Sequence, residues 1–184
     1  DRHFSRYINK SPTVLEIGVA GGGSIEMWNY YFGKGCKIYG VDIDQHCKSI
    51  EKHIPDTKIF IGDQEDPSFW KKFKKDVPKI DILIDDGGHT MRQQIATFEC
   101  MYDHVKDDGV YLCEDLHTSY WNWKNRMGGS IYKGGLKREG TFIEYSKNFI
   151  DYINAWHSES PLLNVSNFTK SVHSIHYYDS IVVI

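Results

Sequence analysis

The stretch LEIGVAGGGS, residues 15–24, decides the fold of this chain. An apolar run leads into a glycine-rich turn, and Ser24 opens a segment of helical periodicity, which is typical of a strand, a tight turn and a helix. Such a turn lets a ligand approach the backbone and meet the positive end of the helix. Gly18, Gly23 and Ser24 are therefore predicted to bind a cofactor. A turn with nothing bound is the alternative, and a dinucleotide-binding protein also carries glycines here.

Short β-like runs alternate with helix-period segments along most of the chain. The expected strands are residues 13–19, 37–42, 58–62, 80–84 and 109–113, followed by an antiparallel hairpin of residues 172–178 and 180–184. Asp66-Pro67 and Thr90 predict helix starts between strands. A last helix is expected from Phe142 to Trp156, with its apolar face in the core. The pattern predicts an α/β, Rossmann-like fold, one domain over residues 1–184, with a mostly parallel seven-stranded sheet, an antiparallel last strand and helices on both faces.

Composition excludes several classes of protein. The 184 residues are 40% hydrophobic and 26% charged, with a formal net charge of -3, and no apolar run is long enough to span a bilayer. Nothing in this charge favours a nucleic-acid partner. The four cysteines lack CxxC spacing and are expected to be reduced thiols of a cytoplasmic protein. Both ends look truncated, because the chain lacks an initiator Met and stops within an apolar run.

Acidic residues recur at the ends of successive predicted strands. Glu16 precedes the glycine turn, where it suits the amino group of a methionine moiety and would repel a pyrophosphate. Asp42 is placed to accept ribose hydroxyls, and Asp63 with Gln64 to bond an adenine edge. Since an NAD-binding protein needs no acid at position 63, the series favours S-adenosylmethionine as the cofactor.

Two acid pairs follow the fourth and fifth predicted strands, Asp85-Asp86 and Glu114-Asp115, with His89 close behind the first. If these strands are parallel neighbours, the carboxylates crowd at one sheet edge and require a positive partner. A hard divalent cation with oxygen ligands meets this requirement. Because side chains alternate along a strand, Asp85 and Asp86 are expected to face different ways.

These motifs together resemble one family, the magnesium-dependent class I S-adenosylmethionine methyltransferases that methylate sugar hydroxyls on macrolides of the mycinamicin and tylosin type. The resemblance runs from about Thr13 to Tyr178. Its most specific pieces are IDDGGH, residues 84–89, and EDLHTSY, residues 114–120; EIG at residues 16–18 and GDQ at residues 62–64 also match.

The resemblance implies a role for each matching residue. Asp86, Glu114 and Asp115 would ligate Mg²⁺, and His89 would be the general base for a sugar hydroxyl. Four further residues would hold S-adenosylmethionine: Glu16, Asp42, Asp63 and Gln64. Asp85 is expected on the cofactor side or in a structural role. Members of this family carry additional chain before this domain for substrate binding and assembly, so a homo-oligomer and a small-molecule acceptor are expected.

Residues 116–138 show no clean periodicity and follow the fifth predicted strand. A loop of this length is usually functional, so it is expected to cover the mouth of the site. Tyr120 and Trp121 are predicted to stack on the apolar face of a sugar. A subunit interface or a plain ordered loop is the alternative.

Three other functions remain open at this point. A catechol-type methyltransferase would use the same metal but would need no histidine base. An NAD-dependent sugar oxidoreductase or epimerase is disfavoured by Glu16, by Asp63 and by the absence of a Tyr-xxx-Lys pair. A non-catalytic S-adenosylmethionine-binding module is disfavoured by the full set of acids beside His89.

Overall fold

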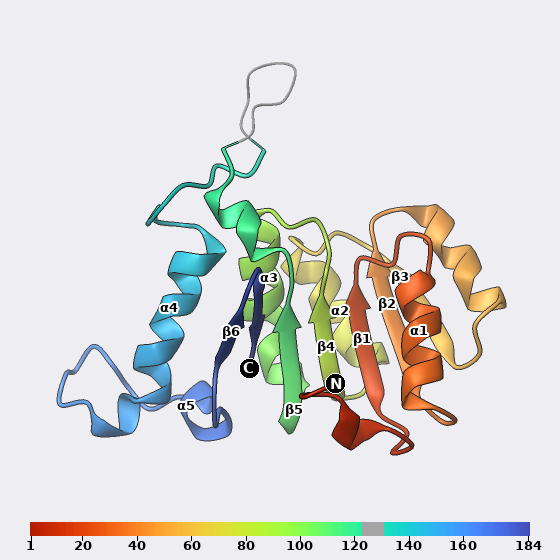
Figure 1. Ribbon diagram of the computed structural model, residues 1–184, viewed down its shortest axis with the longest axis horizontal. Helices are drawn as coiled ribbons and strands as arrows, with labels where there is room; N and C mark the ends of the chain where they lie inside the picture. The colour runs from red at the N-terminus through yellow and green to blue at the C-terminus, as the bar shows by residue number, and fades with distance from the viewer. Residues whose placement is uncertain (123–130) are drawn as a thin grey trace.

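A seven-stranded sheet forms the centre of the computed structural model, which describes residues 1–122 and 131–184 (Figure 1). The strands are β1 (Thr13–Ile17), β2 (Lys37–Asp42), β3 (Thr57–Ile61), β4 (Ile80–Asp85), β5 (Val105–Cys113), β6 (His176–Tyr178) and β7 (Ile181–Val183). Their order is β3-β2-β1-β4-β5-β7-β6. Neighbours among β1 to β5 are parallel, whereas β7 is antiparallel to both β5 and β6. The Rossmann-like, mostly parallel sheet predicted from the sequence is confirmed.

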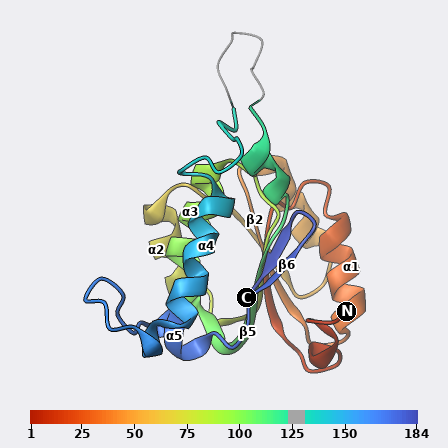
Figure 2. The ribbon, with the colours of Figure 1, turned by 60° about the vertical axis from the view of Figure 1, so that its left-hand side comes forward.

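Helices cover both faces of this sheet. The α-helices are α1 (Gly23–Phe32), α2 (Pro67–Asp76), α3 (Met91–Met101), α4 (Phe142–Ile153) and α5 (Asn167–Ser171). Short 3₁₀ turns are η1 (Ser5–Tyr7), η2 (Gln45–Lys52), η3 (Tyr102–His104), η4 (Leu116–Tyr120) and η5 (Ala155–His157). Figure 2 shows α2, α3 and α4 on one face and α1 on the other. Among the described residues, no helix has both the length and the apolarity to cross a bilayer.

Two hydrophobic clusters enclose the sheet. Leu83 and Phe149 belong to the cluster on the α2–α4 face, while Ile84 and Phe32 belong to the cluster on the α1 face. Leu83 and Ile84 are adjacent in β4 and face opposite clusters, as the two-residue period of a strand requires. The same alternation decides the side to which each acid at a strand end is directed.

The C-terminal third departs most from the expected boundaries. The expected helix to Trp156 ends at Ile153, because Asn154 leaves the helical conformation with φ -98° and ψ 5°. Trp156 lies in η5 and is 59% exposed, so the prediction that it faces the core is wrong. The expected strand 172–178 shortens to β6, because Val172 ends α5 instead.

Outside this region, β5 begins four residues earlier than expected, at Val105.

The helix starts predicted at Asp66 and Thr90 are both confirmed. Asp66 Oδ1 accepts the backbone N–H of Ser68 at 2.8 Å, and Pro67 occupies the first helical position of α2. Thr90 and Gln93 form a reciprocal capping box at the start of α3.

Replacement of the α2 cap by alanine tests this local contribution. Asp66→Ala should lower the free energy of unfolding by about 1 kcal/mol, because it leaves an N-terminal amide without its acceptor. Urea denaturation measures the change, and Asp66→Asn, which keeps a side-chain oxygen, is the matched control. Equal losses in the two variants would contradict a capping role for the oxygen.

Candidate active site

The carboxyl ends of β1, β2, β4 and β5 meet at one edge of the sheet, the upper edge in Figure 1. The glycine turn after β1 packs directly on the loop after β4 there. Gly18 has φ +92°, and a Cβ atom on it would lie 2.0 Å from the carbonyl oxygen of Asp86. Only glycine allows this approach, so the predicted cofactor turn and the first acid pair form one site.

Asp86, His89 and Asp115 form the centre of this site. One ligand atom from each lies within 4.8 Å of the other two. His89 Nε2 is 3.3 Å from Asp115 Oδ2 and 4.0 Å from Asp86 Oδ1. The side chains remain accessible, with exposures of 21% for His89, 39% for Asp86 and 42% for Asp115. His89 and Asp115 both adopt the left-handed backbone conformation with φ +56°, which is uncommon for residues other than glycine.

Glu114 lies beside this group and is not part of it. The pairing of Asp85 with Cys113 makes Asp86 and Glu114 neighbours at the strand ends. Burial raises the pKa of Glu114, and the carboxylates of Asp86 and Asp115 raise it further. Burial also raises the pKa of Asp86, where His89 opposes the shift and Asp115 adds to it. Asp86, Glu114 and Asp115 therefore repel one another, as expected from the two acid pairs in the sequence.

Asp85 turns away from this group into the protein interior. Its side chain is buried, and Gln64 Nε2 donates to its Oδ1 at 3.1 Å. Gln64 Nε2 also contacts Thr97 Oγ1, and Gln64 Oε1 accepts the N–H of Gly88 at 2.9 Å. The predicted opposite directions of Asp85 and Asp86 are confirmed. The Gln64 side chain is engaged inside the protein, whereas Asp85 Oδ2 is buried without a hydrogen-bond partner among the described residues. The predicted contacts of Gln64 and Asp85 with a cofactor stay predictions.

Glu16 is buried on the α1 side of the sheet, below the glycine turn. Burial raises the pKa of Glu16 to about 7, and the nearby Asp86 and Glu114 contribute, although hydrogen bonds from Ser24 and Trp28 work against the shift. Its Oε2 atom is buried without a hydrogen-bond partner among the described residues. An unpaired acceptor of this kind is costly unless a ligand supplies a donor.

Asp42 and Asp63 follow β2 and β3 at the same edge. Asp42 Oδ2 accepts the N–H groups of Val19 and Ala20 at 2.9 and 3.0 Å, and its Oδ1 accepts that of Asp44. Burial raises the pKa of Asp42, but these hydrogen bonds outweigh it and lower the pKa overall. Asp63 is exposed. Asp42 thus shapes the glycine turn, and its predicted contact with a ribose stays a prediction, as does that of Asp63 with adenine.

The sequence did not predict the residues that contact Asp115 and the loop around it. His117 Nδ1 lies 3.7 Å from Asp115 Oδ1 and hydrogen-bonds Ser180 Oγ, which comes from the turn between β6 and β7. Gln94 of α3 donates to the carbonyl of Glu114 at 2.9 Å. No sequence motif marks Ser180 or Gln94, because their roles arise from the packing of distant segments.

The predicted aromatic pair lies at the margin of the site. The ring of Trp121 lies 4.3 Å from that of His117 and 5.7 Å from that of Tyr132, whereas Tyr120 is exposed. Part of the expected covering loop, including Trp123, lies outside the described residues. Contact between this pair and a sugar stays a prediction.

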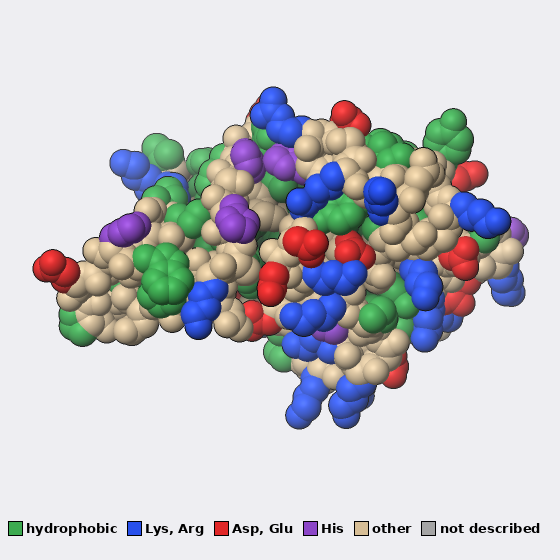
Figure 3. All heavy atoms as spheres, turned by 90° about the horizontal axis from the view of Figure 1, so that it is seen from below, with side chains coloured by type: hydrophobic (Ala, Val, Ile, Leu, Met, Phe, Trp, Pro, Cys, Tyr) green, Lys and Arg blue, Asp and Glu red, His purple; other side chains and the backbone are tan. Residues whose placement is uncertain are grey.

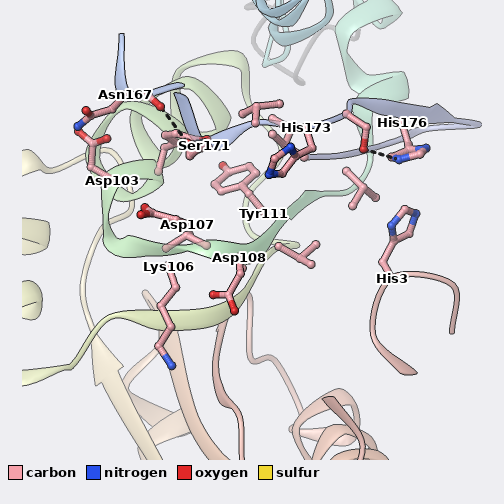
Figure 4. A pocket seen from close by; sticks show the side chains of 18 of the residues that line it. His3, Asp103, Lys106, Asp107, Asp108, Tyr111, Asn167, Ser171, His173 and His176 are labelled. Atoms are coloured by element: carbon pink, nitrogen blue, oxygen red, sulfur yellow. Dashed lines mark hydrogen bonds between the residues drawn. The ribbon is translucent and has the colours of Figure 1, made fainter. Parts of the chain in front are cut away.

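A groove of about 890 Å³ lies at the amino ends of β4 and β5 (Figure 4). Figure 3 views the molecule from below and shows cationic side chains interspersed with acidic ones. In the groove, Lys106 pairs with Asp81 at 2.7 Å, and His176 hydrogen-bonds Ser174. The candidate metal ligands found in the described part of the chain all lie at the opposite edge. Since ligands of open α/β sheets bind at the carboxyl edge, we assign the functional site there despite the size of this groove.

The residues at the carboxyl edge fit both expected groups. Glu16 Oε2 offers an unpaired acceptor for an amino group, and Cβ atoms on Gly21 and Gly23 would meet nothing within 4 Å, so the turn has open space above it. Carboxylates that repel one another are the donors that a hard divalent cation requires. The site therefore suits S-adenosylmethionine beside Mg²⁺.

Comparisons with known proteins point in the same direction. No protein-family model matches the chain. Demethylmacrocin O-methyltransferase of Streptomyces fradiae is 35% identical over 168 residues, covering 88% of this chain and 40% of the relative. Mycinamicin VI 2''-O-methyltransferase of Micromonospora griseorubida is 35% identical over 170 residues, covering 88% and 39%. The solved structure of the mycinamicin-pathway methyltransferase MycE with Mg and SAH is 30% identical, with a TM-score of 0.81, and covers 100% of this chain and 46% of that one.

The fold and the sequence define the class of this protein. Its architecture is that of the class I S-adenosylmethionine-dependent methyltransferases. Within that class, the chain is related to the sugar O-methyltransferases of macrolide and tetracenomycin pathways and spans less than half the length of these relatives.

The buried carboxyl of Glu16 predicts a pH-dependent stability in the absence of cofactor. Its pKa rises from an ordinary 4.5 to about 7 on folding, so the folded protein keeps a proton that the unfolded chain loses in this range. The stabilisation is complete below pH 4.5 and disappears as the pH rises to about 7. The loss amounts to roughly 3 kcal/mol.

Comparison of the wild type with Glu16→Gln isolates this effect, because Asp85 and the other titrating groups are common to both. Urea unfolding across this pH range should show the stability of the wild type falling relative to the variant. Parallel pH profiles would contradict a protonated, buried Glu16.

Proposed function

We propose that this chain is a single methyltransferase domain that moves a methyl group from S-adenosylmethionine to a hydroxyl of a sugar or a glycosylated natural product. The observation that carries the proposal is the meeting of Asp86, His89 and Asp115 beside the glycine turn and Glu16. The structure of MycE with Mg, SAH and mycinamycin VI, 30% identical over the whole chain, supports it. The acceptor is then a small molecule.

Asp86, Glu114 and Asp115 would hold the magnesium ion, because Mg²⁺ prefers oxygen ligands and these three carboxylates repel one another without it. The ion would supply positive charge that orients and acidifies the acceptor hydroxyl. Glu16 would receive the amino group of the cofactor on its unpaired oxygen, and Asp42 and Asp63 would bind farther along it.

His89 would take the proton of the acceptor hydroxyl as the methyl group leaves sulfur and the new C–O bond forms. The side chain suits this role because its Nε2 faces the acids at 3.3 and 4.0 Å while 21% of it remains exposed. Trp121, next to His117 at the margin of the site, would offer an apolar surface for a sugar ring, and Tyr120 a second one.

A second role for His89 follows from one observation. The group whose ligand atoms lie within 4.8 Å contains His89 in place of Glu114. His89 could therefore ligate the cation itself, and the base would then be another group.

Removal of the metal tests the proposed function. The purified full-length protein should bind S-adenosylmethionine at micromolar affinity or tighter by calorimetry, with no signal from NAD. It should transfer a labelled methyl group to a glycosylated macrolide, lose turnover in EDTA and regain it with excess Mg²⁺. Undiminished turnover in the chelator would contradict the metal, and binding of NAD alone would contradict the methyltransferase assignment. A catechol used as an alternative acceptor tests the small-phenol function.

Two variants separate the roles of Glu114 and His89. Glu114→Gln should weaken Mn²⁺ binding about tenfold or more, roughly 1.4 kcal/mol, with cofactor affinity kept within about tenfold. His89→Ala should keep Mn²⁺ affinity within about threefold and lower kcat about 100-fold or more, because it removes the base and no ligand. Electron paramagnetic resonance of free Mn²⁺ gives the affinities. The reverse pattern, weak binding only in His89→Ala, would make His89 a ligand.

A further inference from the structure

The two residues that face one another at the centre of the site have unusual backbones. His89, in the loop after β4, and Asp115, after β5, both have φ +56°. Residues other than glycine keep this conformation only where surrounding contacts hold it. Some contact must therefore fix each of the two turns, and the distance of 3.3 Å between His89 Nε2 and Asp115 Oδ2 depends on both.

Thr118 provides a contact to both turns. Its Oγ1 lies 2.9 Å from the carbonyl oxygen of His89 and 2.9 Å from that of Asp115. Its backbone N–H also donates to the carbonyl of Asp115 at 3.1 Å. The residue is 1% exposed, so water does not compete for these bonds. A hydroxyl has a single proton, so it donates to one carbonyl at a time or is shared between both.

Other hydrogen bonds between the loops after β4 and β5 hold the strand ends, and within residues 1–122 and 131–184 it is Thr118 that bonds the carbonyl of His89 itself. The N–H of Glu114 donates to the carbonyl of Asp85 at 2.9 Å, and Gln94 Nε2 donates to the carbonyl of Glu114 at 2.9 Å. Neither bond involves His89 or Asp115. The Thr118 hydroxyl thus joins the two residues whose side chains meet in the site.

We propose that Thr118 is a positioning residue whose hydroxyl fixes the turns of His89 and Asp115 relative to each other and so sets the imidazole–carboxylate separation. Its catalytic meaning rests on the proposed function, because the Asp115 turn places a proposed ligand of the cation and the His89 turn places the proposed base. The effect on the His89–Asp115 distance does not depend on the proposed function, because it follows from the contacts of Thr118 Oγ1 with the two carbonyl groups.

Ser119 is a matched control in the same 3₁₀ turn, η4. It is also 1% exposed and has a hydroxyl with two partners, Met91 Sδ at 3.4 Å and the N–H of Ile143 at 3.2 Å. Neither partner is a site residue. Ser119→Ala therefore removes a buried hydroxyl from the same turn without touching His89 or Asp115.

The test uses the purified full-length protein and five forms: wild type, Thr118→Val, Thr118→Ala, Thr118→Ser and Ser119→Ala. Mn²⁺ affinity is measured by electron paramagnetic resonance, affinity for S-adenosylhomocysteine by calorimetry and stability by thermal unfolding. Thr118→Val and Thr118→Ala should weaken Mn²⁺ binding about tenfold, roughly 1.4 kcal/mol. Thr118→Ser should stay within about threefold of the wild type because it keeps the hydroxyl. Ser119→Ala should lower Tm and leave Mn²⁺ affinity within about threefold.

The proposal would be overturned if Thr118→Ala bound Mn²⁺ as tightly as the wild type. It would also be overturned if Thr118→Ser bound Mn²⁺ as weakly as Thr118→Ala, or if Ser119→Ala lost as much Mn²⁺ affinity as Thr118→Ala. If Thr118→Val fails to fold, Thr118→Ala still tests the proposal. Alanine places no new methyl group beside the carbonyl groups of His89 and Asp115. Affinity for S-adenosylhomocysteine should remain within about twofold throughout, which separates an effect at the cation from general loss of structure.

A crystal structure of Thr118→Ala without cation gives a readout that does not depend on methyl transfer. His89 Nε2 and Asp115 Oδ2 should then be more than 4 Å apart, and an unchanged separation would overturn the proposal. A wild-type protein that binds Mn²⁺ and transfers no methyl group would contradict the proposed function while leaving the test of Thr118 readable.

Discussion

Repulsion between carboxylates at the carboxyl edge of the sheet is the constraint on which the site depends. Burial raises the pKa of Glu16, Asp86 and Glu114, and neighbouring acids add to each shift. Charges brought together in a medium of low dielectric cost free energy unless a cation compensates them. The sheet holds the acids in place because the strands that carry them pair in parallel register, which fixes their ends side by side.

Close approach of backbone to backbone turns these strand ends into one site. A Cβ on Gly18 would overlap the carbonyl of Asp86, and a Cβ on Gly87 would lie 2.1 Å from Gln64 Oε1. The loops after β1, β3 and β4 are thus in direct contact, and glycine is required where they touch. Movement of one loop would displace the others, so these contacts hold the glycine turn and the first acid pair in one fixed arrangement.

The sequence predicted the strands, the caps at Asp66 and Thr90 and the convergence of the acids, because each depends on local pattern and the alternation of β and α segments. It did not predict the hydrogen bond between Ser180 and His117, because Ser180 lies in a hairpin about 60 residues further along the chain and its position depends on the register of that hairpin. The contacts of the Gln64 side chain depend on packing and were likewise out of reach. Trp156 was misassigned because apolar periodicity continues past the residue that ends the helix.

Backbone conformation explains why the two acid pairs behave differently. Asp85 and Asp86 follow the alternation of β4, so one enters the core and the other reaches the site. The same rule applied to the second pair would send Asp115 away from Glu114 and towards the α2–α4 side. The left-handed turn at Asp115, φ 56° and ψ 36°, interrupts the alternation and directs its carboxylate back towards His89. Both acids of the second pair therefore lie at the candidate site, whereas only Asp86 of the first pair does.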